Sequence, residues 1–278
     1  MTVPGVVVGP RIGPFDGSMD ADFVRRYAAA TKDPSPLVQA GDAVPAVAVV
    51  TQIWDAQEAG RAAFLPQALH DASTGGVHGE HDIVLHRPIV PGEPLRTFVE
   101  GHGSRPAGRN SLTTLRYTTF DADDSVVAEQ WWTTVYLGVT CEATGQPVPD
   151  HGFPDAAREH CVGTYEIDVD PDMPRRYAEV SGDWFAHHFD LEAAAATGFD
   201  RLFLHGLCTM ALCAQGVVDL VADGDPTRVR RVAVRFATPT FLGEQLRVQL
   251  YDAGPIGFAF EADSAGALVV AHGRAELR

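Results

Sequence analysis

Two long apolar segments stand out along the chain, and alternating hydrophobic and polar positions follow each of them. Residues 44–65 and residues 205–222 are rich in apolar side chains, and the second segment is apolar on nearly all sides. A helix of that composition is expected to lie buried, with other elements packed around it. The pattern therefore predicts one apolar helix in each half of the chain, the second of them buried.

Segments with a period of two follow both apolar helices, as expected for strands with one buried face. In the first half they are LRTFVEGHG, LTTLRYTTFD and VVAEQWWTTVYLG, and in the second RVAVRFATP, LRVQLYDA, IGFAFEADS and ALVVAHGRAEL, with Gly-rich turns between them. A short helix around the sequence RRYA precedes each apolar helix. This order predicts an α+β fold in which an antiparallel sheet wraps a central helix.

The two halves of the chain also resemble each other in sequence. Residues 24–38 align with residues 174–188 at an offset of 150, and residues 88–96 align with residues 239–247 at an offset of 151. Two separate matches at nearly one offset are difficult to obtain by chance. They predict a duplicated unit of about 130 residues, which is a usual size for a domain.

A stretch rich in glycine, proline and polar residues lies between the two repeats, at residues 138–156. Such a composition is typical of a connecting segment. We therefore expect an N-terminal repeat at residues 1–140, a linker at 141–160 and a C-terminal repeat at 161–278.

Composition and charge exclude several classes of function. The 278 residues carry a formal net charge of −16, which argues against binding to nucleic acid or to an anionic membrane surface. No apolar run approaches the roughly 20 residues that a membrane-spanning helix needs. No signal peptide is visible at the start, and the four cysteines form no Cys-x-x-Cys pair, so a cytoplasmic protein with reduced thiols is expected.

The stretch SGDWFAHHFD, at residues 181–190, sets titratable groups among aromatic side chains. Burying a charged group costs free energy, so such a group is expected to have a partner or a function. The aligned stretch of the first repeat keeps the carboxylate, as Asp33, but has Val38 where the second repeat has His188. A structural role common to both copies would favour keeping both residues. The difference therefore favours a site that operates in the second copy alone.

A carboxylate and an imidazole form a competent acid–base pair near neutral pH, so Asp183 and His188 are the candidate catalytic residues. Further along the chain, His205 and Gly206 begin the second apolar helix. A free amide at a helix N-terminus can stabilise an oxyanion, although a glycine there also permits close packing of helix on sheet. We expect Asp190 to cap a short helix at residues 191–197, which Gly198 would end.

A metal site would require Asp183, His187, His188, Asp190 and His205 to converge. Adjacent histidines tend to point apart, and the sequence has neither a His-Glu-x-x-His nor a His-x-His motif. We therefore expect no metal, with His187 as a neighbour of the site.

The sequences YAEVSGDWFAHHFD and AAATGFDRLFLHGL together resemble the pattern of the MaoC-like, (R)-specific enoyl-CoA hydratases and dehydratases. The residues that fit the pattern are Tyr177, Ser181, Gly182, Asp183, His188, Asp190, Gly198, Phe199, His205 and Gly206. In the first half, HGEHDIVLHRPIVPGE resembles the degenerate N-terminal repeat of the two-repeat members. The resemblance thus covers nearly the whole chain.

The resemblance implies a double hot-dog fold and the reversible hydration of a trans-2-enoyl thioester to a (3R)-3-hydroxyacyl thioester. Asp183 and His188 would activate the water, and the Gly206 amide would bind the thioester oxygen. Ser181, Phe185 and His205 would belong to the substrate-binding set. No metal or redox cofactor is implied, and coenzyme A would be part of the substrate. The implied partner is an acyl-CoA or acyl carrier protein thioester, and the chain would form a homodimer or pair with a related subunit.

The sequence departs from this pattern at the Asn-Pro pair, which is replaced by Phe185-Ala186, and at an aliphatic position taken by His187. Two alternatives to the hydratase stay open: a hot-dog thioesterase, and a non-catalytic subunit that completes the pocket of a partner. The arginines of residues 227–236 would suit the phosphates of coenzyme A, or would serve as charges on a solvated strand.

Overall fold

The computed structural model describes residues 2–150, 152–196 and 198–278. The described chain forms two compact units, and neither is continuous in sequence. Unit 1 comprises residues 1–17, 52–86 and 94–150, and unit 2 comprises residues 18–51, 87–93 and the chain after Asp150. The units therefore do not follow the order of the two sequence repeats. The repeat boundaries expected at residues 140 and 160 stay a prediction.

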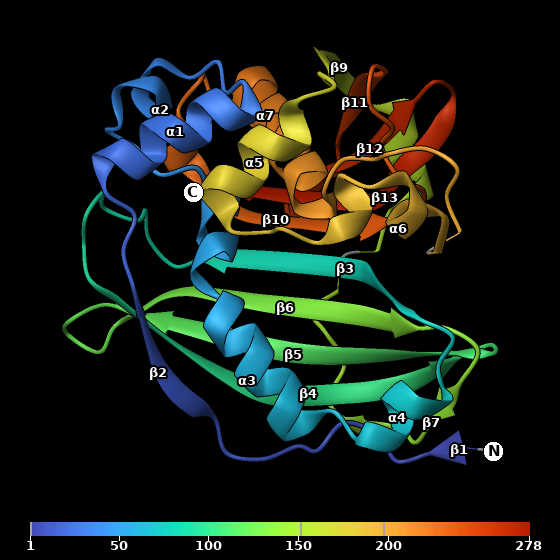
Figure 1. Cartoon of the computed structure of the whole chain (residues 1–278). Helices are drawn as coiled ribbons and strands as arrows, with labels where there is room; N and C mark the ends of the chain where they lie inside the picture. Colours follow the sequence, from blue (N-terminus) through green and yellow to red (C-terminus); the bar gives the residue numbers. More distant parts are fainter. Residues whose placement is uncertain (1, 151, 197) are drawn as a thin grey trace. The chain divides into compact units, whose positions relative to one another are not determined.

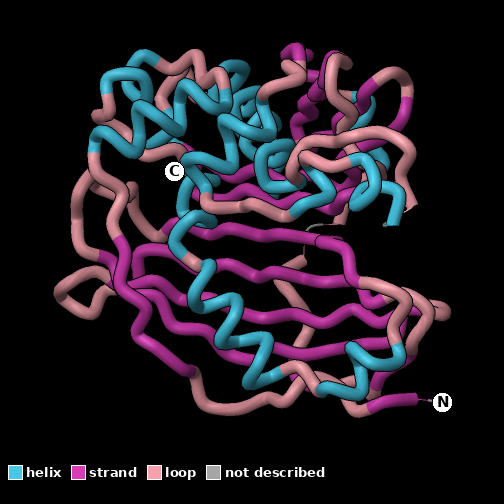
Figure 2. Tube along the Cα trace, in the orientation of Figure 1, coloured by secondary structure: helices cyan, strands magenta, loops and turns pink. Residues whose placement is uncertain are grey.

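Unit 1 is an antiparallel sheet with a helix on one face. Its strands run in the order β2–β4–β5–β6–β3, and Figure 2 shows a helix, α3, lying across them. The bounds are β2 Ile12–Gly17, α3 Trp54–Phe64, α4 Gln67–Ala72, β3 Gly76–Leu85, β4 Leu95–Ala107, β5 Asn110–Phe120 and β6 Val126–Tyr136. Short strands β1 (Thr2–Val3), β7 (Thr140–Cys141) and β8 (Thr144–Gly145) lie at its margin, where β7 pairs with β1 and β8 pairs with β4.

The core of unit 1 forms where α3 meets β4 and β5. Burial alternates along most of β4 and β5, and Val99, Leu115 and Tyr117 are among the buried residues of the core. A Cβ at Gly60 would lie 2.7 Å from a methyl carbon of Val99, so glycine allows α3 to approach the sheet closely. The alternation in the sequence thus gives one buried face, as predicted.

In unit 2 the sheet strands run in the order β10–β13–β12–β11–β9. Helix α7 packs on β9, β10 and β11 of this sheet (Figure 1). The strands are β9 Cys161–Asp168, β10 Val229–Phe236, β11 Gln245–Asp252, β12 Phe258–Ser264 and β13 Ala267–Leu277. The α-helices are α1 Ala21–Thr31, α2 Pro36–Ala40, α5 Met173–Ser181, α6 Leu191–Ala196 and α7 Gly206–Val221, and the 3-10 helices are η1 Ala46–Gln52, η2 Asp155–Glu159, η3 Ala186–His188, η4 Pro226–Arg228 and η5 Gly254–Ile256.

Helix α7 confirms the predicted apolar helix of the second half. Every residue from Leu207 to Val217 is buried, as expected for a helix that is apolar on nearly all sides. A Cβ at Gly216 would lie 3.1 Å from Tyr165 of β9, so this glycine brings the helix close to the sheet. None of the helices in the described part of the chain is long and apolar enough to span a bilayer.

The apolar helix predicted at residues 44–65 is wrong as a single element. The structure has η1 at Ala46–Gln52, a break at Ile53 with φ of −113° and ψ of 1°, and then α3. The segment before the break is rich in β-branched residues, which lower helix propensity, and the Thr51 hydroxyl bonds the carbonyl of Ala48 at 2.8 Å. The division between the units falls after Thr51, so η1 lies mainly in unit 2 and α3 in unit 1.

The sequence repeat is also present in the structure. Helices α1 and α5, which carry the two RRYA sequences, pack against each other in unit 2 (Figure 1), and the rings of Tyr27 and Tyr177 lie 6.2 Å apart. In the second pair of matching segments, Gly92 donates to the Met19 carbonyl and Gly243 donates to the Val169 carbonyl, both at 2.8 Å. The same backbone contact thus recurs in both copies, at offsets of 151 for the donor and 150 for the acceptor.

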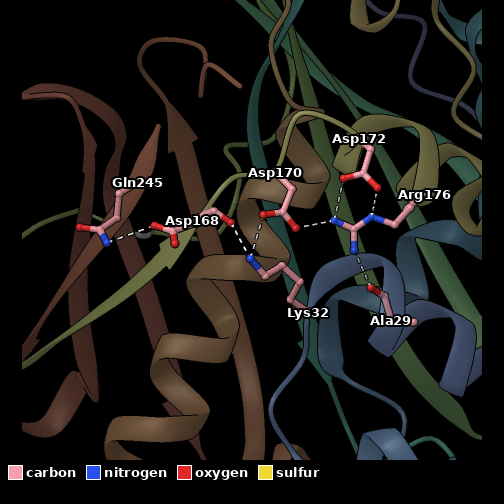
Figure 3. Close-up of polar contacts among 7 residues, drawn as sticks. All are labelled: Ala29, Lys32, Asp168, Asp170, Asp172, Arg176 and Gln245. Atoms are coloured by element: carbon pink, nitrogen blue, oxygen red, sulfur yellow. Dashed lines mark hydrogen bonds and ion pairs between the residues drawn. The ribbon is translucent and has the colours of Figure 1, made fainter. Parts of the chain in front are cut away.

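The single lysine of the chain fastens α1 to the segment that joins β9 and α5 (Figure 3). The Nζ of Lys32 donates to the Asp168 carbonyl at 3.1 Å and to Asp170 Oδ1 at 3.0 Å. Arg176 of α5 contacts the same Asp170 carboxylate at 2.7 Å and the Ala29 carbonyl of α1 at 3.1 Å. Two cations and one carboxylate therefore tie the two RRYA helices together.

Candidate active site

The candidate catalytic residues lie in unit 2, between α5 and α7. Helix α5 ends at Gly182, whose φ of 80° and N–H bond to the Ala178 carbonyl turn the chain away from the helix. Asp183 follows directly and is 8 % exposed. Its amide donates to Ser181 Oγ at 3.2 Å, and its Oδ1 accepts the amide of Phe185 at 3.4 Å. The turn after α5 therefore holds the carboxylate in a buried position.

The His188 ring is oriented by a backbone carbonyl. His188 ends η3 and is 6 % exposed. Its Nδ1 lies 3.0 Å from the carbonyl oxygen of Phe203, to which it donates. A neutral imidazole has one N–H, so this bond leaves Nε2 as an acceptor. The β-bridge between Phe203 and Phe241 fixes the strand segment that supplies the carbonyl.

His205 joins the same cluster from the N-terminus of α7. It is completely buried, and its ring centroid lies 3.7 Å from that of His188. Its Nε2 donates to the backbone carbonyl of Asp183 at 3.0 Å, whereas its buried Nδ1 has no hydrogen-bond partner among the described residues. One potential ligand atom each from Asp183, His188 and His205 lies within 4.8 Å of the other two. The structure thus brings Asp183 and His188 together, as predicted, and places the imidazole of His205, which was expected in the substrate-binding set, beside them.

Burial sets the protonation states of this cluster. Desolvation raises the pKa of Asp183 to about 6. Desolvation, with the neighbouring rings of His205 and His187, holds the pKa of His188 far below its usual value. Desolvation likewise lowers the pKa of His205 to about 4. At pH 7 the site therefore holds two neutral imidazoles beside a carboxylate that accepts a proton readily.

Gly206 is the first residue of α7, so its amide has no partner within the helix. The preceding His205 is extended, with φ of −55° and ψ of 135°. A Cβ at Gly206 would lie 3.3 Å from the Phe236 ring, so the glycine also serves close packing on the sheet. The geometry is compatible with both roles considered for Gly206, and its part as an oxyanion donor stays a prediction.

Aromatic rings form one side of the site. Phe185 stacks on His187 at 5.9 Å and 10°, and His187 stacks on Phe203 at 5.4 Å and 13°. Phe185 is 55 % exposed and Trp184 is 53 % exposed, which places apolar surface beside the buried Asp183. The His187 ring lies 4.2 Å from that of His188. His187 is therefore a member of this ring stack and a direct neighbour of the cluster.

Asp190 caps α6, as predicted. Its Oδ1 accepts the amides of Glu192 and Ala193 at 2.7 and 2.9 Å. The described part of the helix ends at Ala196, because Thr197 lies outside the described residues. Gly198 has φ of +96°, which agrees with its expected place at the end of the helix.

One contributor to the site was not found from the sequence. Phe203 supplies both the carbonyl that orients His188 and a ring of the stack. The buried ring of Tyr177, one of the residues that fit the family pattern, lies 5.1 Å from His205. The position of Phe203 two residues before His205 was the available clue, because a segment that leads into the site helix must pass the site. The arginines considered for phosphate binding include Arg228, Arg230 and Arg231, which pair with carboxylates of this chain.

Part of the chain resembles known proteins in sequence. A model of the MaoC like domain matches residues 153–262. Enoyl-CoA hydratase 2, peroxisomal, of Arabidopsis thaliana is 27% identical over 184 residues, or 63% of this chain and 59% of that protein. The 3-hydroxyacyl-thioester dehydratase Y of Mycobacterium tuberculosis is 28% identical over 201 residues, or 68% of this chain and 66% of that protein. The matches therefore span less than two thirds of the length of these relatives.

The fold comparison covers nearly the whole chain. The crystal structure of a MaoC-like dehydratase from Phytophthora capsici superposes with a TM-score of 0.80, at 22% sequence identity, over 97% of this chain and 96% of that chain. Both repeats are thus included in the likeness. The chain contains a MaoC-like domain at residues 153–262 and has the double hot-dog fold of the MaoC-like dehydratases.

Proposed function

We propose that the chain is a hydro-lyase that adds water reversibly to a trans-2-enoyl thioester and yields a (3R)-3-hydroxyacyl thioester. The observation that carries the proposal is the buried cluster of Asp183, His188 and His205, in which one side-chain nitrogen or oxygen atom of each residue lies within 4.8 Å of the other two. The cluster falls inside the MaoC-like domain. Relatives named as an enoyl-CoA hydratase and a 3-hydroxyacyl-thioester dehydratase support the same reaction class.

In this mechanism one water molecule is held between the Asp183 carboxylate and the free Nε2 of His188. Both groups accept hydrogen bonds at pH 7, so they orient a lone pair of the water oxygen toward C3 of the substrate. The C3–O bond forms as the C2–C3 π electrons move toward the thioester carbonyl. One water proton passes to the cluster and is returned to C2 on the same face, which completes the addition.

Negative charge develops on the thioester oxygen during this step. The Gly206 amide at the start of α7 is free to donate to that oxygen, and the helix dipole adds to its effect. This hydrogen bond is stronger in the transition state, where the oxygen carries negative charge, than in the bound substrate. It therefore lowers the activation barrier more than it strengthens substrate binding. His205 acts as a positioning residue, because its bond to the Asp183 carbonyl holds the carboxylate turn in place.

The acyl group is expected to contact the Phe185–His187–Phe203 ring stack. Phe185 stands where the family pattern has a polar asparagine, and it presents an exposed apolar face beside Asp183. Its ring stacks on His187, which in turn stacks on Phe203. We therefore expect a preference for an apolar acyl group. Coenzyme A or an acyl carrier protein would carry the acyl group, and no redox or metal cofactor is needed. A cytoplasmic location and assembly as a homodimer or with a related subunit remain predictions.

A panel of trans-2-enoyl-CoA thioesters tests the proposal. Loss of the absorbance of the conjugated thioester reports hydration, and a thiol reagent added to parallel samples reports release of coenzyme A. We expect absorbance loss without thiol release, and a product that chiral chromatography identifies as the 3R isomer. Thiol release in step with turnover would establish the thioesterase alternative. Absence of both reactions across the panel would favour the non-catalytic subunit.

A further inference from the structure

We propose that Asp183, His188 and His205 also form a binding site for a divalent transition-metal ion, best suited to Zn²⁺, and that the bound ion blocks the water-activating site. Two imidazole nitrogens and a carboxylate oxygen are a usual donor set for zinc in proteins. The three potential ligand atoms lie within 4.8 Å of one another. Within the part of the chain that the structure describes, this cluster stands alone as a candidate set of three such side chains.

The hydrogen bonds around the two histidines match those of metal ligands. A metal-bound imidazole almost always donates its other ring N–H to a carbonyl or carboxylate, which fixes the tautomer and aims the remaining nitrogen at the metal. Here His188 Nδ1 donates to the Phe203 carbonyl, and His205 Nε2 donates to the Asp183 carbonyl, each at 3.0 Å. The outer contacts of a two-histidine site are thus in place before any ion binds.

The free nitrogen of His205 points to a ligand that the proposed hydration does not require. His205 is completely buried, and its Nδ1 has no partner among the described residues. A buried acceptor without a partner is costly, so a ligand that occupies it is favoured.

Zinc requires only a modest rearrangement of the cluster. Ligand atoms about 2.0–2.2 Å from a tetrahedral zinc lie roughly 3.4 Å from one another, so ligand atoms now within 4.8 Å of one another must draw together by up to about 1.4 Å. Asp183 is the residue best placed to move, because the amide of Phe185 holds its Oδ1 through a long contact of 3.4 Å. Water or an anion would complete the fourth position.

Bound zinc would inhibit because it takes the atoms that hold the water in the proposed mechanism. Coordination occupies the Asp183 oxygen and the free nitrogen of His188, so neither group remains to accept the water proton. This consequence rests on the proposed function, whereas binding of the ion does not. The two claims can therefore be measured separately.

Cobalt is the probe for binding, because Co²⁺ occupies zinc sites and gives visible bands that differ between tetrahedral and octahedral coordination. Metal-free protein is titrated with Co²⁺, and then with Zn²⁺ to displace it. We expect one equivalent of tetrahedral cobalt without the charge-transfer band of a thiolate ligand. Asp183→Asn and His205→Gln should weaken binding at least roughly 100-fold, since even outer contacts of metal ligands account for factors of 10–100.

Two control variants separate this site from others. Asp33→Asn removes the equivalent carboxylate of the first repeat, and Cys161→Ser removes the exposed thiol. Both should bind cobalt like the unaltered protein, and circular dichroism should show all four variants folded. Cobalt binding that is absent, or that survives both Asp183→Asn and His205→Gln, would overturn the site. In enoyl-CoA assays, Zn²⁺ should lower the rate of hydration, and a chelator should restore it. An increase in this rate on addition of Zn²⁺ would contradict the proposed inhibition.

Discussion

The two copies of the segment that follows each RRYA helix share a buried carboxylate but differ in nearly everything around it. In the first copy Asp33 accepts the amide of Ser35 at 2.9 Å, and in the second Asp183 accepts the amide of Phe185 at 3.4 Å. Burial raises the pKa of each carboxyl to about 6. The turn that buries a carboxylate therefore belongs to the repeat itself and does not by itself make a catalytic site.

The difference between the copies lies in their partners. Position 188 supplies an imidazole, whereas the equivalent Val38 is a fully buried aliphatic residue in α2. Asp33 lies in a small cavity with Tyr27 and Gln215, while Asp183 lies beside two histidines. Chemistry in this chain thus depends on the residues that break the symmetry of the repeat. The following variants change residues of one copy or the other.

His188→Val gives the second copy the residue of the first and should have the largest effect. Loss of the free Nε2 removes one of the two groups that hold the water, so kcat/KM should fall by roughly 10²–10⁴-fold. Initial rates of enoyl-CoA hydration measure the change, with thermal unfolding as a check of the fold. A loss below about tenfold would assign proton transfer to another group.

Gly206→Pro tests the amide that begins α7. Proline lacks the N–H but suits the first position of a helix, and the extended conformation of His205 fits the residue before a proline. We expect kcat to fall roughly 10²–10³-fold, the range found on removing an oxyanion donor. The melting temperature should fall, because a Cβ at this position lies 3.3 Å from the Phe236 ring. Unchanged kcat in a folded variant would leave Gly206 with its packing role alone.

Asp33→Asn tests how much the buried, ionised carboxylate of the first copy, which lacks the histidine, lowers the free energy of unfolding. The raised pKa means that the folded protein binds this proton more tightly than the unfolded chain, so stability falls as pH rises from about 4 to about 6. The ionised group should then cost up to about 3 kcal/mol. The asparagine variant can keep the bond to Ser35 without this cost.

Urea unfolding at pH 8 and pH 4 measures this effect. The Asp33→Asn variant should be more stable than the unaltered protein at pH 8, and the difference should nearly vanish at pH 4. Equal stabilisation at both pH values would mean that the carboxyl does not titrate as described. Lower stability of the variant at pH 8 would mean that the ionised Asp33 is favourably paired.

Changes at Lys32 should have the smallest effect. Lys32 occupies the left-handed cap position that Gly182 occupies in the second copy, with φ of 55° against 80°. Lys32→Met keeps the strained backbone and loses the contacts with Asp170, so unfolding free energy should fall by about 1 kcal/mol. Lys32→Gly also relieves a strain of about 1 kcal/mol and should be nearly neutral. Equal destabilisation by Lys32→Met and Lys32→Gly would mean that relief of backbone strain does not offset the lost contacts with Asp170.

Sequence patterns predicted the elements whose hydrophobic period is regular. Helix α7 and the strands β4 to β6 and β10 to β13 agree with the segments chosen from apolar spacing. The break at Ile53 was missed, because the surrounding residues are apolar enough for a buried helix and the interruption depends on β-branched residues and tertiary contacts. The division of the chain into two interleaved units likewise depends on contacts between distant segments.

The candidate site was predictable where its residues lie close in sequence. Asp183 and His188 share one ten-residue stretch, and their proximity followed from it. His205 was selected for the helix it begins, and its ring contact with His188 and its free Nδ1 arise from folding of the intervening segment. The Phe203 carbonyl could not be identified from side-chain chemistry, because any residue supplies a carbonyl.

The matched pair Asp183→Asn and Asp33→Asn tests the central claim most directly. Both substitutions remove a carboxylate with the same backbone contact and the same direction of pKa shift. With a trans-2-enoyl-CoA that the unaltered protein hydrates, kcat/KM should fall roughly 10²–10⁴-fold for Asp183→Asn and stay within about twofold for Asp33→Asn. Equal losses in the two folded variants, or full activity in Asp183→Asn, would contradict a site formed by the second copy alone.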